Sequence, residues 1–269
     1  AVYHPFTMKK STAFVALALT IALAGTATTF AAPAQTAAVL PPGFDALVAR
    51  SLKTFDVPGM GIAVVKDGRI VLAKGYGVRK LGETAPVDAR TLFGIASNTK
   101  VFTATALALL VEEGKLAWDA PGTRYLRGFQ LSDPYVTREL TVRDLLVHRS
   151  GLGLGAGDLL LFPETTYGRR EIVERLREVP LATSFRSAYA YDNVLYVAAG
   201  ELIEAVSGRT WEDFVAERIL KRVGMASSRT RHTADVAGLN VAIPHAHLEG
   251  AATPQPIDEN DNMNAAGGI

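Results

Sequence analysis

The chain has 269 residues, of which 48% are hydrophobic and 20% charged, as expected for a globular protein with an ordinary core. Its 28 basic and 27 acidic side chains leave a net charge of +1, so there is no basic excess that would indicate a nucleic-acid partner. Cysteine is absent, which excludes disulfides, thiolate metal sites, a cysteine nucleophile and a lipid-modified N-terminal cysteine.

Residues 8–31 have the pattern of a secretory signal peptide, and residues 1–7 before them are interpreted as a non-native leader. Met8 and two lysines precede a short apolar run at residues 14–25 (FVALALTIALAG), and residues 29–31 (TFA) resemble a cleavage site. We therefore expect a periplasmic or secreted product, with no membrane contact beyond the signal peptide. The alternative is an uncleaved anchor, although the apolar run is shorter than the about 20 residues that a spanning helix needs.

Residues 41–269 are expected to form the folded domain. A helical apolar pattern at residues 44–55 precedes two β-rich runs at residues 60–78, which flank Asp67-Gly68, a strong hairpin signal. Residues 91–116 then predict a turn and a long apolar helix that ends at Gly114. Because this helix is nearly free of charge, we expect it to be the most buried helix of the domain.

The second half of the domain is predicted to be mostly helical. Thr141 with Asp144, and Thr210 with Asp213, match capping boxes that open helices. A two-stranded hairpin is only marginally stable alone, and little after Ile243 is expected to supply more strands, so the domain is interpreted as C-terminally incomplete. Helices are predicted at residues 141–148, 170–179, 193–206 and 211–223.

A first chemical motif, Ser97-Asn98-Thr99-Lys100, stands where the long apolar helix begins. Side chains at positions i and i+3 share a helix face, so the Ser97 hydroxyl and the Lys100 amine can meet. A serine hydroxyl is a weak nucleophile until a base takes its proton, and a lysine that burial keeps from its ammonium form can be that base. The alternative is a helix-capping serine beside a solvated lysine.

A second motif is Tyr191-Asp192-Asn193. In an extended segment, side chains at i and i+2 point the same way, so Tyr191 and Asn193 would face one cleft. A tyrosine beside ammonium groups can serve as a base or proton shuttle, and Asn193 can hold a substrate carbonyl or Lys100. The alternative is a tyrosine packed in a loop, with Asp192 or Asn193 capping the next helix.

Together these motifs resemble the serine β-lactamase and penicillin-binding superfamily. The tyrosine form of the second motif is typical of its class C β-lactamase-related branch, which also holds D-alanyl-D-alanine carboxypeptidases and SxxK carboxylesterases. The resemblance covers about residues 44–269 and implies an α+β, β-lactamase/transpeptidase-like fold: an antiparallel sheet flanked by helices, plus a helical lobe, with the C-terminal strands missing. It includes the segments FGIASNTKVFTATALALLVEEGKLAWDAP, LTVRDLLVHRSGL, YAYDNVLYVAAGELIEAVSG and AAGGI.

The resemblance implies a serine hydrolase that forms an acyl-enzyme. Ser97 would be the nucleophile, Lys100 and Tyr191 would move protons, and Asn193 would bind substrate. The substrate would be a β-lactam or a D-alanyl peptide, or alternatively a short-chain ester. No cofactor is implied, and a monomer is expected.

One departure from the family matters. No Lys/His-Thr/Ser-Gly triplet follows Asn193, and in the family this third motif supplies a cation and adjoins half of the oxyanion hole. The Ser97 N–H would supply the other half. A hypothesis of another class is therefore an inactive fragment that only binds such ligands, and Arg186 is the first candidate for a substitute cation.

The histidines carry weaker signals. His148 matches a structural position of the family. His245 and His247 are spaced for one face of a strand and could join Asp258 or Asp261 around a metal, but strand alternation explains them equally well. Because nothing else has ligand spacing, no metal site is expected.

Overall fold

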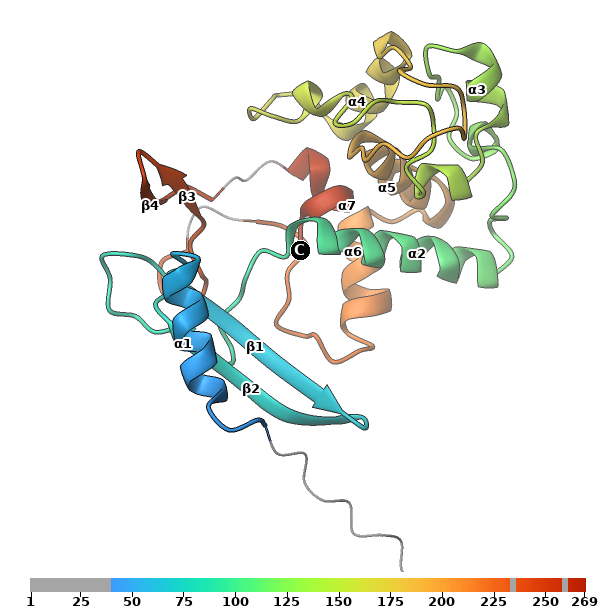
Figure 1. Cartoon of the computed structure of the whole chain (residues 1–269). Coiled ribbons are helices and arrows are strands. Elements are labelled where there is room, and N and C mark those ends of the chain that lie inside the picture. Colours follow the sequence, from blue (N-terminus) through green and yellow to red (C-terminus); the bar gives the residue numbers. More distant parts are fainter. Residues whose placement is uncertain (1–39, 233–235, 258–260) are drawn as a thin grey trace, which may run out of the picture. The chain divides into compact units, whose positions relative to one another are not determined.

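The computed structural model describes residues 40–232, 236–257 and 261–269, which form helices and two small antiparallel sheets (Figure 1). The predicted leader and signal peptide lie outside these residues. Within the described part of the chain, no helix is long and apolar enough to cross a membrane.

The N-terminal elements are helix α1 (Phe44–Thr54) and a hairpin of β1 (Gly59–Lys66) and β2 (Arg69–Gly77). The strands pair antiparallel from Gly59↔Gly77 to Lys66↔Arg69, with an irregular register between Val64 and Val65. Asp67 and Gly68 form the predicted turn, and both have positive φ values, 51° and 71°, as a two-residue type I′ turn requires.

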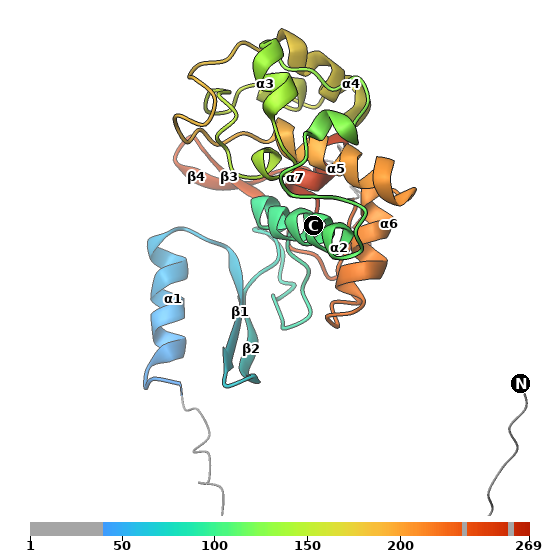
Figure 2. The same cartoon turned by 90° about the vertical axis from the view of Figure 1, so that its right-hand side faces the viewer.

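The remaining elements are mostly helical, and short 3₁₀ turns separate or extend the longer helices. Helices α2, α5 and α7 lie against one another, with α6 packed beside them (Figure 2). The helices are α2 (Lys100–Glu112), α3 (Pro134–Glu139), α4 (Arg169–Arg175), α5 (Val194–Ser207), α6 (Trp211–Val215) and α7 (Asn264–Gly267), and a π-helical turn (Ala216–Leu220) follows α6.

The core lies among α2, α4, α5 and α6. Helix α5 is more completely buried than α2, contrary to the sequence-based expectation. On α2, Leu107 and Leu110 are fully buried but Val101 remains 60% exposed, whereas α5 is buried almost continuously from Val194 to Ile203. The difference arises because α5 packs against α2, α4, α6 and α7, which cover it on several sides.

The first capping box is confirmed but opens a shorter element than predicted, and at the second, Thr210 caps α6 by accepting from the Asp213 N–H at 3.1 Å. The Asp144 carboxylate accepts from the Thr141 N–H at 2.9 Å, and the Asp144 N–H donates to Thr141 Oγ1 at 3.3 Å. Only one 3₁₀ turn (Arg143–Leu145) follows. His148 has a φ of 56°, in the left-handed region, so a right-handed helix cannot continue through it.

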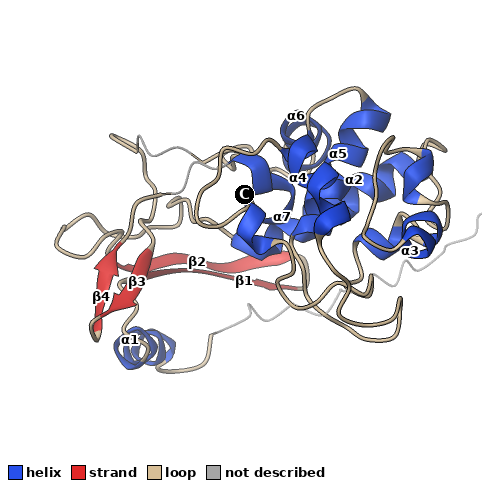
Figure 3. Ribbon diagram, turned by 90° about the horizontal axis from the view of Figure 1, so that it is seen from above, coloured by secondary structure: helices blue, strands red, loops and turns tan. Residues whose placement is uncertain are grey.

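Two strands follow Ile243, where little strand structure was expected. Strands β3 (His245–Leu248) and β4 (Ala251–Pro254) pair antiparallel around Glu249-Gly250, whose positive φ values of 52° and 84° form a tight turn. They pair with each other and not with β1 or β2, so the two sheets are separate pairs of strands (Figure 3).

Candidate active site

Ser97 lies in a single 3₁₀ turn (Ala96–Thr99) directly before α2. Ala96 has a φ of 45°, a sparsely populated conformation for a residue with a Cβ atom. The neighbouring backbone is tied down, since the Ile95 N–H donates to the Ile269 carbonyl at 2.7 Å and the Asn98 N–H donates to the Ile95 carbonyl at 3.1 Å. The surrounding structure therefore holds the nucleophile candidate in a fixed, strained turn.

Lys100 is buried, with 7% of its surface exposed, and its Nζ contacts oxygens from three separate segments. These are Ser97 Oγ at 3.2 Å, Asn193 Oδ1 at 2.8 Å and the Ala266 carbonyl at 2.9 Å. Nζ also lies 4.8 Å from the ring centre of Tyr191 and 5.2 Å from that of Tyr196, both within range of a cation–π contact. The three acceptors match the three N–H donors of an ammonium group.

Tyr191 completes the surroundings of Ser97. Its hydroxyl donates to Ser97 Oγ at 2.6 Å, so Oγ lies between Tyr191 and Lys100. The structure thus brings together all four residues that the sequence singled out: Ser97, Lys100, Tyr191 and Asn193. Asn193 contacts Lys100, one of its two predicted partners.

Asp192 fills the capping role that the sequence had offered as an alternative. Its Oδ1 accepts from the Leu195 N–H at 3.1 Å, at the beginning of α5. Asp192 is fully buried, whereas Tyr191 and Asn193 on either side of it face Ser97 and Lys100. The i, i+2 pattern and the cap therefore coexist in the same three residues.

The His148 ring packs against the Tyr191 ring. Its ring centre lies 4.5 Å from that of Tyr191 and 5.5 Å from that of Tyr196, and its Nδ1 accepts from the Asp192 N–H at 3.3 Å. Burial raises the pKa of Tyr196 to about 12, so its hydroxyl stays neutral and donates to the Leu146 carbonyl at 3.0 Å. These contacts fix the position of the Tyr191 ring.

Asp158 is a site residue that the sequence reasoning missed. Its Oδ1 and Oδ2 accept from Asn193 Nδ2 at 3.1 Å and 3.3 Å. Burial raises the pKa of Asp158 above its usual range, although the hydrogen bond from Asn193 acts in the opposite direction. A usable signal was present, because Asp158 is the single charged residue in the otherwise apolar and glycine-rich segment 151–162.

Beside Ser97 and Asn193 opens a cavity of about 850 Å³, which lies in the size range of small-molecule sites. Its walls are largely apolar and include Leu92, Phe93 and Ile243. Arg186, the candidate for a substitute cation, lies elsewhere: its Nε and Nη2 donate to the Asp144 carboxylate at 3.0 Å and 2.5 Å.

The histidines of β3 have other partners. His245 Nε2 accepts from the Leu81 N–H at 3.1 Å and its Nδ1 lies 2.8 Å from the Ile243 carbonyl, so both ring nitrogens are occupied. His247 Nε2 lies 3.6 Å from a carboxylate oxygen of Asp56. Asp258 is outside the described residues. Among those that are described, no group of three or more His, Cys, Asp or Glu side chains could hold a metal ion.

The family model for beta-lactamase matches residues 44–269. The unguisins hydrolase ungD of Aspergillus violaceofuscus is 32% identical over 215 residues, which are 77% of this chain and 37% of that protein.

Two solved structures share the fold. The octameric penicillin-binding protein homologue from Pyrococcus abyssi has a TM-score of 0.69 at 29% identity, covering 83% of this chain and 52% of that one. A class C beta-lactamase also has a TM-score of 0.69, at 24% identity, covering 83% of this chain and 59% of that one. The chain therefore spans less than two thirds of the length of each of these relatives.

Proposed function

The chain belongs to the β-lactamase family, whose fold is that of serine hydrolases, and we propose that it hydrolyses its substrate through an acyl-enzyme on Ser97. The observation that carries this proposal is the placement of Lys100 Nζ. Two of its partners, Asn193 Oδ1 and the Ala266 carbonyl, can only accept hydrogen bonds. A neutral Lys100 therefore directs both of its N–H groups to them, and its lone pair is left to face Ser97 Oγ at 3.2 Å.

In the proposed reaction, Ser97 Oγ forms a bond to the substrate carbonyl carbon as Lys100 takes the hydroxyl proton. The Ser97 N–H is the oxyanion donor that the family resemblance implies. The tetrahedral intermediate then loses its leaving group, which takes the hydroxyl proton of Tyr191. The proton held by Lys100 passes to Tyr191 and restores its hydroxyl. In the deacylation step, water attacks the carbonyl carbon of the acyl-enzyme ester, and its proton passes through Tyr191 and Lys100 to Ser97 Oγ. The acid product then departs, and the Ser97 hydroxyl is restored.

For the substrate, we propose a β-lactam or the amide of a D-alanyl peptide. Membership of the β-lactamase family supports this choice, as does likeness to a protein named as a penicillin-binding protein homologue. A short-chain ester is the second candidate, supported by the largely apolar cavity beside Ser97. An inactive protein that only binds such ligands is the competing hypothesis.

The test combines acylation by a fluorescent penicillin with turnover of nitrocefin and of p-nitrophenyl butyrate. We expect the label on the tryptic peptide that contains Ser97, and we expect Ser97→Ala to remove both the label and the turnover. Preference for nitrocefin would support the amide substrate and preference for p-nitrophenyl butyrate the ester. Reversible penicillin binding without any covalent label or turnover would overturn the proposal in favour of the non-catalytic one.

A further inference from the structure

Helix α7 holds Lys100 through its backbone but cannot fix its own position. The Ala266 carbonyl accepts from Lys100 Nζ at 2.9 Å, and the Ala265 carbonyl accepts from Thr103 Oγ1 at 2.7 Å. The helix has only four residues, and a helix of one turn is unstable in isolation. The direction of the Ala266 carbonyl must therefore be set by the contacts that α7 makes with other elements.

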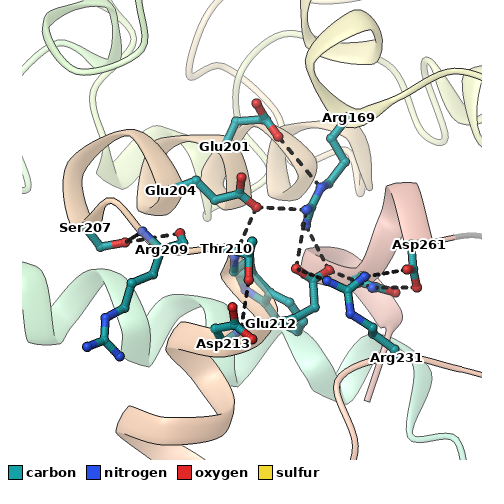
Figure 4. A network of polar contacts seen from close by, with 12 residues as sticks. Arg169, Glu201, Glu204, Ser207, Arg209, Thr210, Glu212, Asp213, Arg231 and Asp261 are labelled. Atoms are coloured by element: carbon teal, nitrogen blue, oxygen red, sulfur yellow. Dashed lines mark hydrogen bonds and ion pairs between the residues drawn. The ribbon is translucent and has the colours of Figure 1, made fainter.

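One of these contacts comes from Glu212 on α6, whose surface is 1% exposed. Glu212 Oε1 accepts from Asn264 Nδ2 at 2.7 Å and from Arg169 Nη1 at 3.0 Å, and its Oε2 accepts from Arg169 Nη2 at 3.3 Å. Arg169 also contacts Glu204 and Glu201, so a single guanidinium is surrounded by three carboxylates (Figure 4). The buried charge of Glu212 is thus compensated, and its oxygens are held in fixed directions.

A second link from α6 reaches α7 by a separate route. Trp211, next to Glu212, donates from Nε1 to Thr103 Oγ1 at 2.9 Å, and Thr103 in turn donates to the Ala265 carbonyl. On the α5 side, a Cβ atom on Gly200 would lie 2.7 Å from Ala265 Cβ, so this glycine allows α7 to approach α5 closely. Helix α7 is therefore clamped between α5, α2 and α6.

Stability alone does not account for a charged group at this position, because a buried ion pair contributes little more than apolar residues of the same volume. The ion pair with Arg169 instead fixes the directions in which the Glu212 oxygens accept hydrogen bonds. We propose that Glu212, acting through Asn264, is a positioning residue for Lys100: it holds α7 so that the Ala266 carbonyl occupies one N–H of Lys100 and the lone pair faces Ser97. This inference rests on the proposed role of Lys100 as the base.

The first variant is Asn264→Ala, which removes the link to Glu212, and with it the bond from Asn264 Nδ2 to Asp261 Oδ1 (3.0 Å), but leaves the Glu212–Arg169 pair in place. We expect kcat per titrated active site to fall on the order of 10-fold with KM within about twofold, because a slightly displaced base slows chemistry without weakening binding. Ile219→Val is the stability control, since it trims a buried side chain beyond α6 and should lower the thermal transition but leave kcat unchanged. Glu217→Gln is the surface control, because Glu217 is exposed and pairs with Arg209.

A rescue experiment tests the direction of the link. Asn264→Asp sets a carboxylate against Glu212 and should lower kcat at least as much as Asn264→Ala. Adding Glu212→Gln restores one amide–carboxylate hydrogen bond with donor and acceptor exchanged, and it removes the bond from Arg169 Nη1, because the oxygen that accepts it becomes the donating nitrogen. Recovery of kcat in the double variant supports positioning through this bond, whereas a further loss of kcat at an unchanged thermal transition would contradict it.

A measurement without substrate separates this inference from the proposed function. In the parent chain, reductive methylation should spare Lys100 and modify the exposed Lys66, as mass spectrometry of tryptic peptides would show. Asn264→Ala should make Lys100 reactive below the thermal transition, and Ile219→Val should not. If Lys100 stays protected in Asn264→Ala, or if both variants expose it equally, Glu212 has no positioning role. Failure of every substrate to acylate the parent would instead count against the proposed function alone.

Discussion

Tyr191→Phe is the most informative single substitution at the site, because it removes one hydroxyl and keeps the ring. The hydroxyl donates to Ser97 Oγ at 2.6 Å, and the ring lies 4.5 Å from that of His148. Positioned proton transfer contributes about 10²- to 10⁴-fold to rate, so we expect kcat/KM to fall within that range. One hydrogen bond contributes about 1 kcal/mol to stability, out of about 5–15 kcal/mol for a domain, so the variant should remain folded.

The assay is the acylation rate constant per active site at neutral pH, measured beside a thermal unfolding curve. Tyr189→Phe is the matched control, because Tyr189 lies two residues away, also contacts the His148 ring at 5.6 Å, and is 67% exposed. It should keep parental kinetics. An unchanged kcat/KM in Tyr191→Phe, or an equal loss in Tyr189→Phe, would refute the proton-transfer role and leave Tyr191 as a packing residue.

Three further predictions concern the nucleophile, Asp158 and export. Ser97→Ala should lower turnover by on the order of 10³-fold or more, and near-parental turnover by this variant would exclude Ser97 as nucleophile. Because burial raises the folded-state pKa of Asp158, its charge costs stability once the pH exceeds the unfolded value of about 4. The stability advantage of Asp158→Asn should therefore grow between pH 4 and pH 7 in urea unfolding, and a constant difference would contradict it. In a Gram-negative host, we propose export to the periplasm, with N-terminal sequencing placing the mature end between about residues 28 and 35; a product that retains Lys9 would indicate an anchor.

Local sequence signals predicted the elements that local chemistry decides. Asp67-Gly68 marked the hairpin turn, and Gly114, with a φ of 69°, marked the end of the long apolar helix. Two pairs of site residues were predicted from their spacing: Ser97 with Lys100 on a helix, and Tyr191 with Asn193 on an extended segment. The family resemblance then indicated that the two pairs meet, although 94 residues separate Tyr191 from Ser97.

The contacts that orient the site left a weaker mark. The Ala266 carbonyl that accepts from Lys100 is a backbone group, so no residue type announces it. Glu212 reads in the sequence as an ordinary acidic residue in the first turn of a helix, and only its burial beside Arg169 shows that it contacts α7 through Asn264. Such contacts depend on how elements pack in three dimensions, and periodicity within one element carries no information about them.

In the proposed mechanism, Asp158 restricts how the proton can move between Ser97 and Lys100, although its side-chain hydrogen bonds are to Asn193 and not to either of them. An ionised carboxylate only accepts hydrogen bonds, so Asn193 must turn its Nδ2 toward Asp158 and its Oδ1 toward Lys100. Lys100 then donates one N–H to Asn193 and another to the Ala266 carbonyl. Only the third position on Lys100 Nζ can alternate between donating to Ser97 Oγ and accepting the proton of the Ser97 hydroxyl. Protonation of Asp158 would give it an O–H donor and remove this restriction on the amide. In the proposed mechanism, a carboxylate whose burial costs stability therefore acts together with the Ala266 carbonyl to keep the Lys100 lone pair directed at Ser97.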